Sequence, residues 1–472
     1  MEAKKIAAFA LGPIAGAALG FITLPIITWF FSQEDIGRLA MLNVVISFSI
    51  LLFSLGLDQA YVREFHGAKN KPALFKIAIL PGLLLLITAL LLLVSSNNVI
   101  SRWLFEVDSL LLSFLVAVAI LSAFLSRFLS LILRMNERGL AYSMSQFLPK
   151  LLLISIVGGY VTFSVTKSIT NLLLANLSAS LFVCIIFSWN TRKEWLLGVK
   201  EKVDYADLKR LLKFGMPLIL GGLAFWGLTA TDKILLKELS DFKQLGLYSV
   251  AVSFAAAAAI FQNVFSTIWA PTVYKWAAAG ENLDKVHSVN RYVLLVVIVL
   301  FCIAGLFSWV VTLILPDNYD SVQWILLPCL GFPLLYTLSE TTVIGIGITR
   351  RSGFAMLAAA LAFLVNLSGN WWLIPIWGAA GAAVSTCVSF WLFLILRTEF
   401  SIYVWRSIPR LCLYSYSSLL VFGAVFSSFY GHIYHQYLMF FWISLLLSVF
   451  IFFKKEIVNT KVWIDRKVYR NK

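Results

Sequence analysis

A few ionisable residues lie inside long apolar stretches of this 472-residue chain, where charge is costly. Lys150 follows Pro149 in one such stretch, and Ser143 and Gln146 precede it at helical spacing on the same face. An ammonium group at the centre of a bilayer costs about 2.5 to 3.5 kcal/mol on insertion scales, so it indicates a function. We expect this polar stripe to face an aqueous cavity. The alternative is a lysine whose stem extends to the interface.

The N-terminal half contains further charges of both signs. Arg127 lies two helical turns before Arg134, so it either lines the same cavity or extends to the interface. Asp58 is followed by Arg63 and Glu64 at the mouth of a span. These three side chains either face the cavity or form a local interfacial ion pair, which contributes little energy.

The C-terminal half has its own candidates. Asp232 and Lys233 are adjacent in one apolar stretch, and Glu340 lies in another with no charged residue within four positions. Burial should favour the protonated form of Glu340 and allow it to carry a proton, unless it is a hydrogen-bonded structural acid. Asn366 and Asn370, four residues apart, are more typical of helix packing than of ligand binding.

Motifs for catalysis or metal binding are missing from the sequence. His432 and His435 have suitable spacing for a metal but lack a third ligand, so we interpret them as part of a loop. The five cysteines include no C-x-x-C pair. There is no phosphate-binding loop, zinc-protease motif, nucleophile elbow or dinucleotide fingerprint. We therefore expect no enzyme activity, no metal and no cofactor, and favour a transporter driven by gradients.

The composition requires a membrane to position these residues. Apolar residues make up 60% of the chain and charged residues only 13%, whereas a typical soluble domain has about a quarter. The net charge of +15 collects between the apolar runs, so it predicts topology and no nucleic-acid partner. We expect an all-α polytopic membrane protein with about fourteen transmembrane helices. They should begin near residues 6, 39, 75, 109, 140, 168, 214, 246, 289, 323, 353, 378, 410 and 437.

Basic residues between the spans predict the orientation. Thirty lysines and arginines fall on one side, and five on the other: Arg38, Arg102, Lys167, Lys237 and Lys243. Because cytoplasmic loops retain positive charge, we expect both termini in the cytoplasm and an even number of spans. The short outer loops leave no room for a folded outer domain, which excludes a large extracytoplasmic active site.

Two halves of the chain resemble each other. Three pairs of segments match at an offset of roughly 204 to 214 residues: 9–21 with 212–225, 35–39 with 244–248, and 134–139 with 349–353. Six spans separate the copies, so the repeats are parallel and the substrate path should run between them. The predicted parts are a bundle at 1–189, an amphipathic linker at 190–213, a second bundle at 214–396, two added helices at 397–453 and a basic cytoplasmic tail at 454–472.

Short motifs near the N-terminus resemble those of bacterial polysaccharide-unit flippases, the Wzx-type O-antigen and capsule exporters of the multidrug/oligosaccharidyl-lipid/polysaccharide superfamily. They are Leu11-Gly-Pro-Ile, Thr23-Leu-Pro25, Ser32-Gln-Glu-Asp-Ile-Gly-Arg38 and Gly56-Leu-Asp-Gln-Ala-Tyr-Val-Arg-Glu64. The resemblance implies two six-helix bundles, MATE-like, in the inner membrane. It implies that they move an undecaprenyl-pyrophosphate-linked oligosaccharide to the periplasmic leaflet, beside polymerase and chain-length proteins of the same pathway.

The charges are consistent with that cargo. A pyrophosphate needs cationic partners, which Lys150, Arg127 and Arg63 supply, whereas a cavity for organic cations would be dominated by acids and aromatic faces. Two alternatives stay open: a cation-coupled multidrug exporter and a flippase for a peptidoglycan precursor. Proton coupling through Glu340, Asp58 or Asp232 also stays open.

Overall fold

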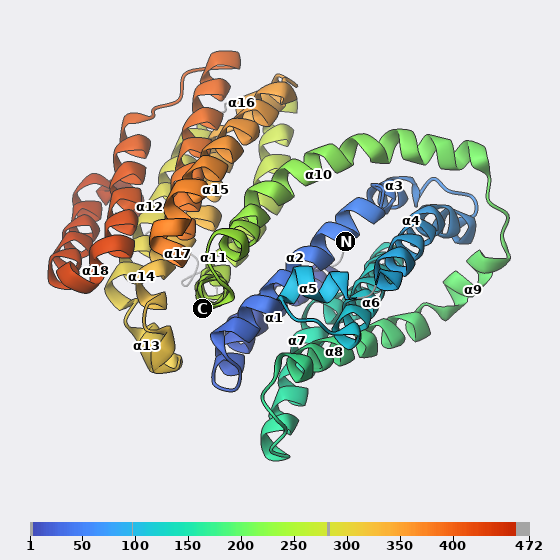
Figure 1. Cartoon of the computed structure of the whole chain (residues 1–472). Coiled ribbons are helices and arrows are strands. Elements are labelled where there is room, and N and C mark those ends of the chain that lie inside the picture. The colour runs from blue at the N-terminus through green and yellow to red at the C-terminus, as the bar shows by residue number, and fades with distance from the viewer. Residues whose placement is uncertain (1–2, 97, 281–283, 459–472) are drawn as a thin grey trace, which may run out of the picture. The chain divides into compact units, whose positions relative to one another are not determined.

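The computed structural model describes residues 3–96, 98–280 and 284–458, and these form helices joined by short connections without any strand (Figure 1). The all-α fold predicted from composition is therefore confirmed. The basic residues expected from 459 onward, and the side chains of Lys4 and Lys5, lie outside this description. The helices are α1 (Ala3–Thr28), α2 (Gln33–Phe53), α3 (Leu57–Glu64), α4 (Lys71–Ser95), α5 (Val99–Phe105), α6 (Leu110–Met135), α7 (Gly139–Thr162), α8 (Ile169–Asn190), α9 (Arg192–Lys200), α10 (Tyr205–Leu239), α11 (Phe242–Ala278), α12 (Lys285–Phe307), α13 (Val310–Ile314), the 3₁₀ helix η1 (Asp317–Tyr319), α14 (Val322–Cys329), α15 (Gly331–Thr342), α16 (Ile344–Ile348), α17 (Ser352–Val404) and α18 (Leu411–Phe452).

Eleven of the described helical segments are long and apolar enough to cross a membrane. Two of them contain a break: Gly378 in α17 has φ 52° and ψ −126°, and Tyr434 in α18 has φ −113° and ψ 30°. A positive φ is accessible to glycine because it lacks a Cβ atom. The breaks lie close to the starts expected near 378 and 437, and α1 is a further apolar helix. The count of fourteen spans stays a prediction.

Hydrogen bonds across each break show that the chain folds back on itself. In α17, Asn366 Nδ2 donates to Thr386 Oγ1 at 3.1 Å, and Ser385 Oγ donates to the Asn366 carbonyl at 2.9 Å. Asn370 Nδ2 donates to Asn366 Oδ1 at 3.1 Å. Both asparagines are fully buried, which confirms the expectation that they join helices.

The chain divides into two compact units, Met1–Ser249 and Val250–Lys472. The first contains α1 to α10 and the start of α11, and the second contains the rest. The first compact unit thus includes α10, whose apolar part the sequence assigned to the second bundle. Compactness and sequence repetition are different criteria, so the boundaries at 190, 214 and 397 stay predictions.

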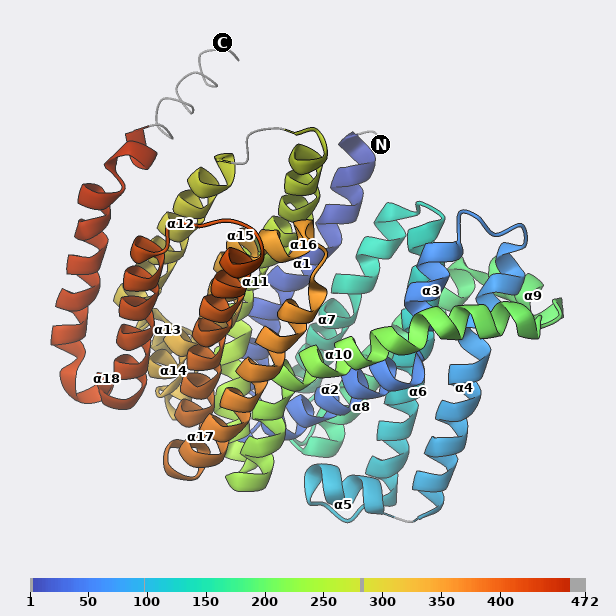
Figure 2. The ribbon, with the colours of Figure 1, turned by 90° about the horizontal axis from the view of Figure 1, so that it is seen from above.

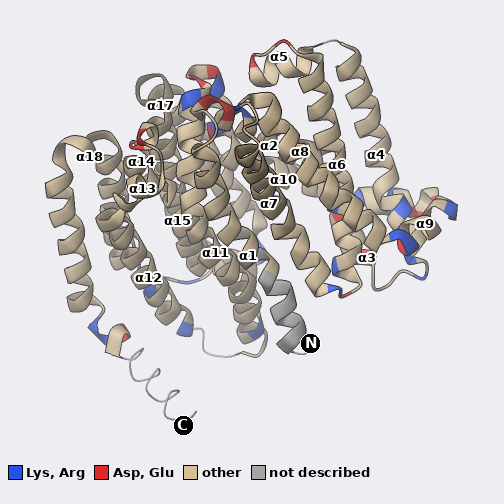
Figure 3. Ribbon diagram, turned by 90° about the horizontal axis from the view of Figure 1, so that it is seen from below, with Lys and Arg blue, Asp and Glu red and all other residues tan. Residues whose placement is uncertain are grey.

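Charged residues of the first unit gather at opposite ends of its helices. At one end, Lys76 Nζ donates to the Val199 carbonyl at 2.9 Å, and Arg138 Nη2 contacts Glu194 at 2.6 Å. Helix α9 therefore lies beside the start of α4 and the turn between α6 and α7. Figures 2 and 3 show α9 near α3, and Figure 3 marks its lysines and arginines in blue. Helix α9, which is part of the predicted linker, thus lies at the end of the first unit that carries the larger set of basic residues.

The smaller set of basic residues occupies the other end of this unit. Arg38 Nε donates to the Phe105 carbonyl at 3.0 Å, and Lys237 Nζ lies 5.4 Å from the ring centroid of Trp103. Arg102 donates a 2.8 Å hydrogen bond to Asp108, which lowers the pKa of that carboxyl group. The separation of the two sets agrees with the predicted two faces.

Glycines let α1 and α7 approach closely. Gly12, Gly16 and Gly20 recur every fourth residue of α1 and face α7. The Gly12 amide donates to Ser143 Oγ at 3.0 Å, and a methyl group on Gly16 would come within 2.9 Å of the Gln146 carbonyl oxygen. This is the small-residue packing that holds helices together in lipid, where the hydrophobic effect cannot.

Two further glycine pairs make close backbone contacts, and one of them joins two matching repeat segments. Gly37 at the start of α2 lies against Gly246 at the start of α11, with a methyl group on Gly37 only 3.2 Å from the Gly246 amide nitrogen. These matching motifs therefore make direct backbone contact within the first unit, which explains their glycines. Gly56, which has φ +66° and lies outside the repeat segments, packs against Gly215 of α10.

Substituting Gly16 tests the α1–α7 contact. We expect Gly16→Ala to destabilise the protein by about 1–3 kcal/mol, because backbone atoms must move to accept the methyl group. The matched control is Gly158→Ala in α7, where a methyl group would meet nothing within 4 Å. It should be neutral or stabilising by about 0.5–1 kcal/mol. Thermal unfolding in detergent measures both, and equal stability of the two variants would contradict this packing.

Candidate functional site

The ammonium group of Lys150 lies against α1 and not in an open polar stripe. Its Nζ donates to the Gly16 carbonyl at 2.6 Å, and the side chain is half-buried. Ser143 is fully buried against α1, so the expectation that it faces a cavity together with Lys150 and Gln146 is wrong for Ser143. Among the residues that the structure describes, no acid lies within 4 Å of Lys150 Nζ. Its remaining N–H groups have no partner there either.

Asp58 and Arg127 form an ion pair between α3 and α6. Arg127 Nη2 donates to Asp58 Oδ2 at 2.7 Å, and Gln59 Nε2 donates to the same oxygen at 3.0 Å. The Asp58 side chain is 9% exposed and that of Arg127 is 37% exposed. The left-handed Gly56 starts α3 in the direction that brings Asp58 to α6. Arg127 Nε is buried without a hydrogen-bond partner among the described residues.

Arg63 and Glu64 lie apart from this pair. Their side chains approach at 3.7 Å, and the Arg63 side chain is 58% exposed, with its guanidinium 4.3 Å from the ring centroid of Phe214. Such an exposed pair contributes little to stability. The local pair considered from the sequence would join Asp58 to Arg63, but Asp58 pairs with Arg127, and only Arg63 and Glu64 form an exposed local contact.

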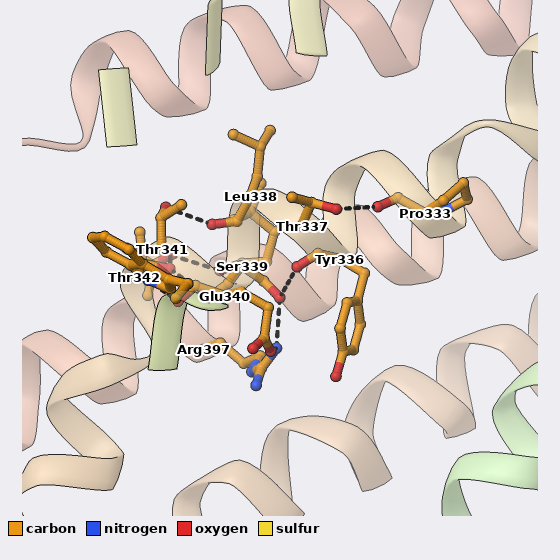
Figure 4. A network of polar contacts seen from close by, with 12 residues as sticks. Pro333, Tyr336, Thr337, Leu338, Ser339, Glu340, Thr341, Thr342 and Arg397 are labelled. Atoms are coloured by element: carbon orange, nitrogen blue, oxygen red, sulfur yellow. Dashed lines mark hydrogen bonds and ion pairs between the residues drawn. The ribbon is translucent and has the colours of Figure 1, made fainter. Parts of the chain in front are cut away.

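Glu340 is held by an arginine from another helix (Figure 4). Arg397 Nη1 of α17 lies 2.8 Å from Glu340 Oε1 of α15 and donates to Ser339 Oγ at 2.7 Å. Both charged side chains are nearly buried, at 12% and 11% exposed. The guanidinium also lies 5.3 Å from the ring centroid of Tyr336 and 4.8 Å from that of Phe393.

This pair corrects two expectations. Glu340 was expected to be an acid without a nearby charge, but Arg397 is its partner. The thirty basic residues that the sequence assigns to the cytoplasmic side include Arg397, but it is nearly buried. Arg397 directly follows the apolar run 390–396, and α17 continues past it to Val404. Spacing along one helix could not identify its partner in α15.

Asp232 and Lys233 occupy adjacent positions of α10. Asp232 is 1% exposed and accepts a 2.7 Å hydrogen bond from the Tyr248 hydroxyl group of α11. Lys233 is only partly buried. The Tyr248 phenol of α11 is thus one partner of the acid, and this hydrogen bond joins α10 to α11.

Two histidines expected in an outer loop lie at the break in α18. His432 and His435 are exposed on either side of the break at Tyr434. Over the parts of the chain that the structure describes, no group of three His, Cys, Asp or Glu side chains could hold a metal ion.

Lys150 differs from the three arginines discussed above because it has no acidic partner among the described residues. Arg127, Arg63 and Arg397 each have an acidic partner, so their net local charge is small. Lys150 has only the carbonyl of Gly16 within the described structure. A carbonyl neutralises no charge, so Lys150 is the group best able to receive an anion inside the first unit.

Comparisons with known proteins agree with this architecture. Residues 3–276 match the model of a family described as polysaccharide biosynthesis proteins. The lipid II flippase MurJ, in an inward closed conformation, is similar with a TM-score of 0.68 and 13% identity, covering 95% of this chain and 99% of that chain. An inward-facing MATE multidrug resistance transporter of the MOP superfamily gives 0.58 and 12%, covering 82% and 94%. No curated protein matches. At these identities, the structural likeness shows the fold.

A double-mutant cycle tests the pair in the second unit. We expect Glu340→Gln to destabilise the protein by about 3–5 kcal/mol, because it leaves the nearly buried Arg397 cation without its counter-ion. Arg397→Gln should act similarly, and the double variant should cost less than the sum by about 0.5–3 kcal/mol. Thermal unfolding in detergent measures all three.

The exposed pair of Arg210 and Asp207, at 2.9 Å on α10, is the matched control. Asp207→Asn should cost under about 1 kcal/mol. Strict additivity of the Glu340 and Arg397 substitutions would show that the two side chains do not interact.

Proposed function

Because this chain belongs to the family of polysaccharide biosynthesis proteins, we propose that it translocates an oligosaccharide linked to undecaprenyl pyrophosphate across the membrane. The family match over residues 3–276 is the observation that carries this proposal. The chain is a multi-pass membrane protein with the transporter fold of the MOP superfamily. The cargo would be a repeat unit of O-antigen or another surface polysaccharide, moved from the cytoplasmic to the periplasmic leaflet.

Lys150 is proposed to bind the pyrophosphate. A pyrophosphate carries about two negative charges at neutral pH, and an ammonium group forms charge-assisted hydrogen bonds with its oxygens. Lys150 can donate without breaking an existing ion pair. Arg127 would contribute its unpartnered Nε while Asp58 holds its position. Arg63 would meet the headgroup at the entrance, since its side chain is largely exposed.

The proposed mechanism is alternating access in the bacterial inner membrane, with both termini cytoplasmic. The glycan headgroup enters from the cytoplasmic side while the polyprenyl tail remains in the lipid. This cycle needs no covalent chemistry, in agreement with a family and neighbours that are transporters. A polymerase and a chain-length protein of the same pathway would receive the product.

Two alternatives can be compared on specific observations. The similarity to MurJ favours a peptidoglycan-precursor flippase, whose lipid and pyrophosphate would use the same cations. The similarity to a MATE transporter favours multidrug export. An exporter of organic cations needs available carboxylates, however, and both Asp58 and Glu340 are occupied by arginines.

The proposed cargo can be tested by substituting Lys150 in cells that depend on this protein for surface glycan. Lys150→Ala should reduce glycan display by about 10- to 100-fold, because one charge-assisted hydrogen bond contributes about 1.5–3 kcal/mol. Lys150→Arg should retain part of the display, because the charge survives. Quantitative glycan staining, with the amount of membrane-inserted protein measured in parallel, gives the result.

Lys243→Ala, at an exposed lysine at the start of α11, is the matched control and should leave display unchanged. Full display by Lys150→Ala would remove Lys150 from the mechanism. Resistance to cationic dyes that depends on the protein, with unchanged glycans on its loss, would favour multidrug export.

We propose that proton coupling, if the cycle uses it, acts through Glu340, with Asp58 and Asp232 as further candidates. A proton can reach the Glu340 carboxylate only when Arg397 withdraws from its 2.8 Å contact, which would link protonation to movement of α17 against α15. In reconstituted vesicles with a lipid-linked oligosaccharide, an imposed pH gradient should accelerate wild-type transport. Glu340→Gln should abolish that response. If the pH gradient does not change the rate of wild-type transport, the role of Glu340 is limited to ion pairing.

A further inference from the structure

A hollow lined by apolar and basic side chains lies at the basic end of the second unit, between the start of α12 and the connection from α17 to α18. Its volume is about 290 Å³. Of its nine lining residues, His287, Arg291 and Arg410 are basic and none is acidic. The others are Asn290, Leu294, Pro409, Leu411, Cys412 and Leu413, all in the second unit.

The basic groups retain unused hydrogen-bond donors. Arg410 Nε lies 3.2 Å from Glu399, while its two terminal nitrogens have no partner among the described residues. Arg291 binds Glu456 through Nε and Nη2, which leaves Nη1. His287 Nδ1 is buried and has no hydrogen-bond partner within the described part of the chain. The two arginines therefore offer N–H groups without a partner among the described residues to an anionic group.

An apolar groove continues from this hollow along α18. The groove has a volume of about 530 Å³ and shares Leu411 and Cys412 with the hollow. Leu419 and Ser415 line it from the first part of α18, and Phe441 and Ser444 from the second. A hydrogen bond of 3.0 Å between the Tyr416 and Ser448 hydroxyl groups joins the two parts at the groove.

We propose that the hollow and groove together bind an anionic glycerophospholipid of the surrounding bilayer. The phosphate would lie among Arg410, Arg291 and His287, and an acyl chain would follow the groove between the two parts of α18. Both arginines are paired, Arg410 with Glu399 and Arg291 with Glu456. The positive charge that favours an anionic headgroup therefore comes from neighbouring lysines in the sequence, Lys285, Lys454 and Lys455.

This site is independent of the proposed function. Basic clusters next to membrane spans attract the anionic lipids of the inner leaflet, and this end carries Lys285, Arg406, Lys454 and Lys455 in addition to the lining residues. A phospholipid here would add to the direct contacts between α12 and the added C-terminal helices, which include the Arg291–Glu456 pair and the packing of Gly305 against Trp442.

The test uses the full-length protein in a mild non-ionic detergent, with phosphatidylglycerol and phosphatidylcholine as probes. Native mass spectrometry should show phosphatidylglycerol retained about tenfold more than phosphatidylcholine, because both carry a phosphodiester but the choline cation cancels the net negative charge that the basic residues attract. Arg410→Gln should abolish this preference. Ser444→Phe, which fills the exposed groove without touching the headgroup pocket, should reduce the retention of both lipids. Arg351→Gln, an exposed arginine outside the hollow, is the matched control and should behave as wild type.

A second measurement needs no variant. Cys412 is only partly buried while the other four cysteines are buried, so its alkylation reports on the hollow. Phosphatidylglycerol should slow alkylation of the wild-type protein, and phosphatidylcholine should not. Equal effects of the two lipids, or an unchanged preference in Arg410→Gln, would overturn the proposal. Stronger protection of Cys412 by undecaprenyl pyrophosphate than by phosphatidylglycerol would assign the site to the cargo and also overturn it.

Discussion

A charge among apolar helices must be matched by an opposite charge or by hydrogen bonds, and both units of this protein are organised by that constraint. In the first unit Asp58 of α3 holds Arg127 of α6, and in the second Glu340 of α15 holds Arg397 of α17. Each pair joins two helices, so each gives a stable contact where the hydrophobic effect gives none. Because the pairs are nearly neutral, they leave Lys150 of α7, which has no acid within 4 Å among the described residues, as a cation available to an anion in the first unit.

The position of Lys150 depends in turn on glycine. Its ammonium reaches the Gly16 carbonyl because Gly12, Gly16 and Gly20 leave no side chains between α1 and α7, and Nζ occupies the space beside Gly20. A larger residue at Gly20 would displace the ammonium, since its Cβ would lie 2.7 Å from Nζ. The glycines of α1 therefore determine both how closely α1 and α7 pack and where the Lys150 ammonium group lies. Substitutions at these glycines change both.

Structural features that depend on local composition could be predicted from the sequence, whereas contacts between distant segments could not. Runs of about twenty apolar residues predicted the helices, and the breaks in α17 and α18 lie near expected boundaries. The repeat around Gly37 and Gly246 was visible as a pattern, but its meaning, a direct backbone contact, was not. Arg397 was misplaced because a charge is judged from its neighbours in sequence, and Glu340 lies in another helix. Ser143 and Lys150 share a helical face as expected, yet α1 covers that face.

A transporter must release what it binds, and this requirement distinguishes the cations of the proposed cycle. Drawing Arg127 toward a phosphate would leave Asp58 without its guanidinium at a nearly buried position, at a cost of several kcal/mol. Lys150 can exchange the Gly16 carbonyl for a phosphate oxygen and later return, and neither step leaves an acid unpaired. The carbonyl remains in the helical hydrogen-bond ladder when the ammonium leaves, so its loss is small. Reversible binding of an anion therefore suits Lys150, while the arginine pairs maintain the helix contacts around it.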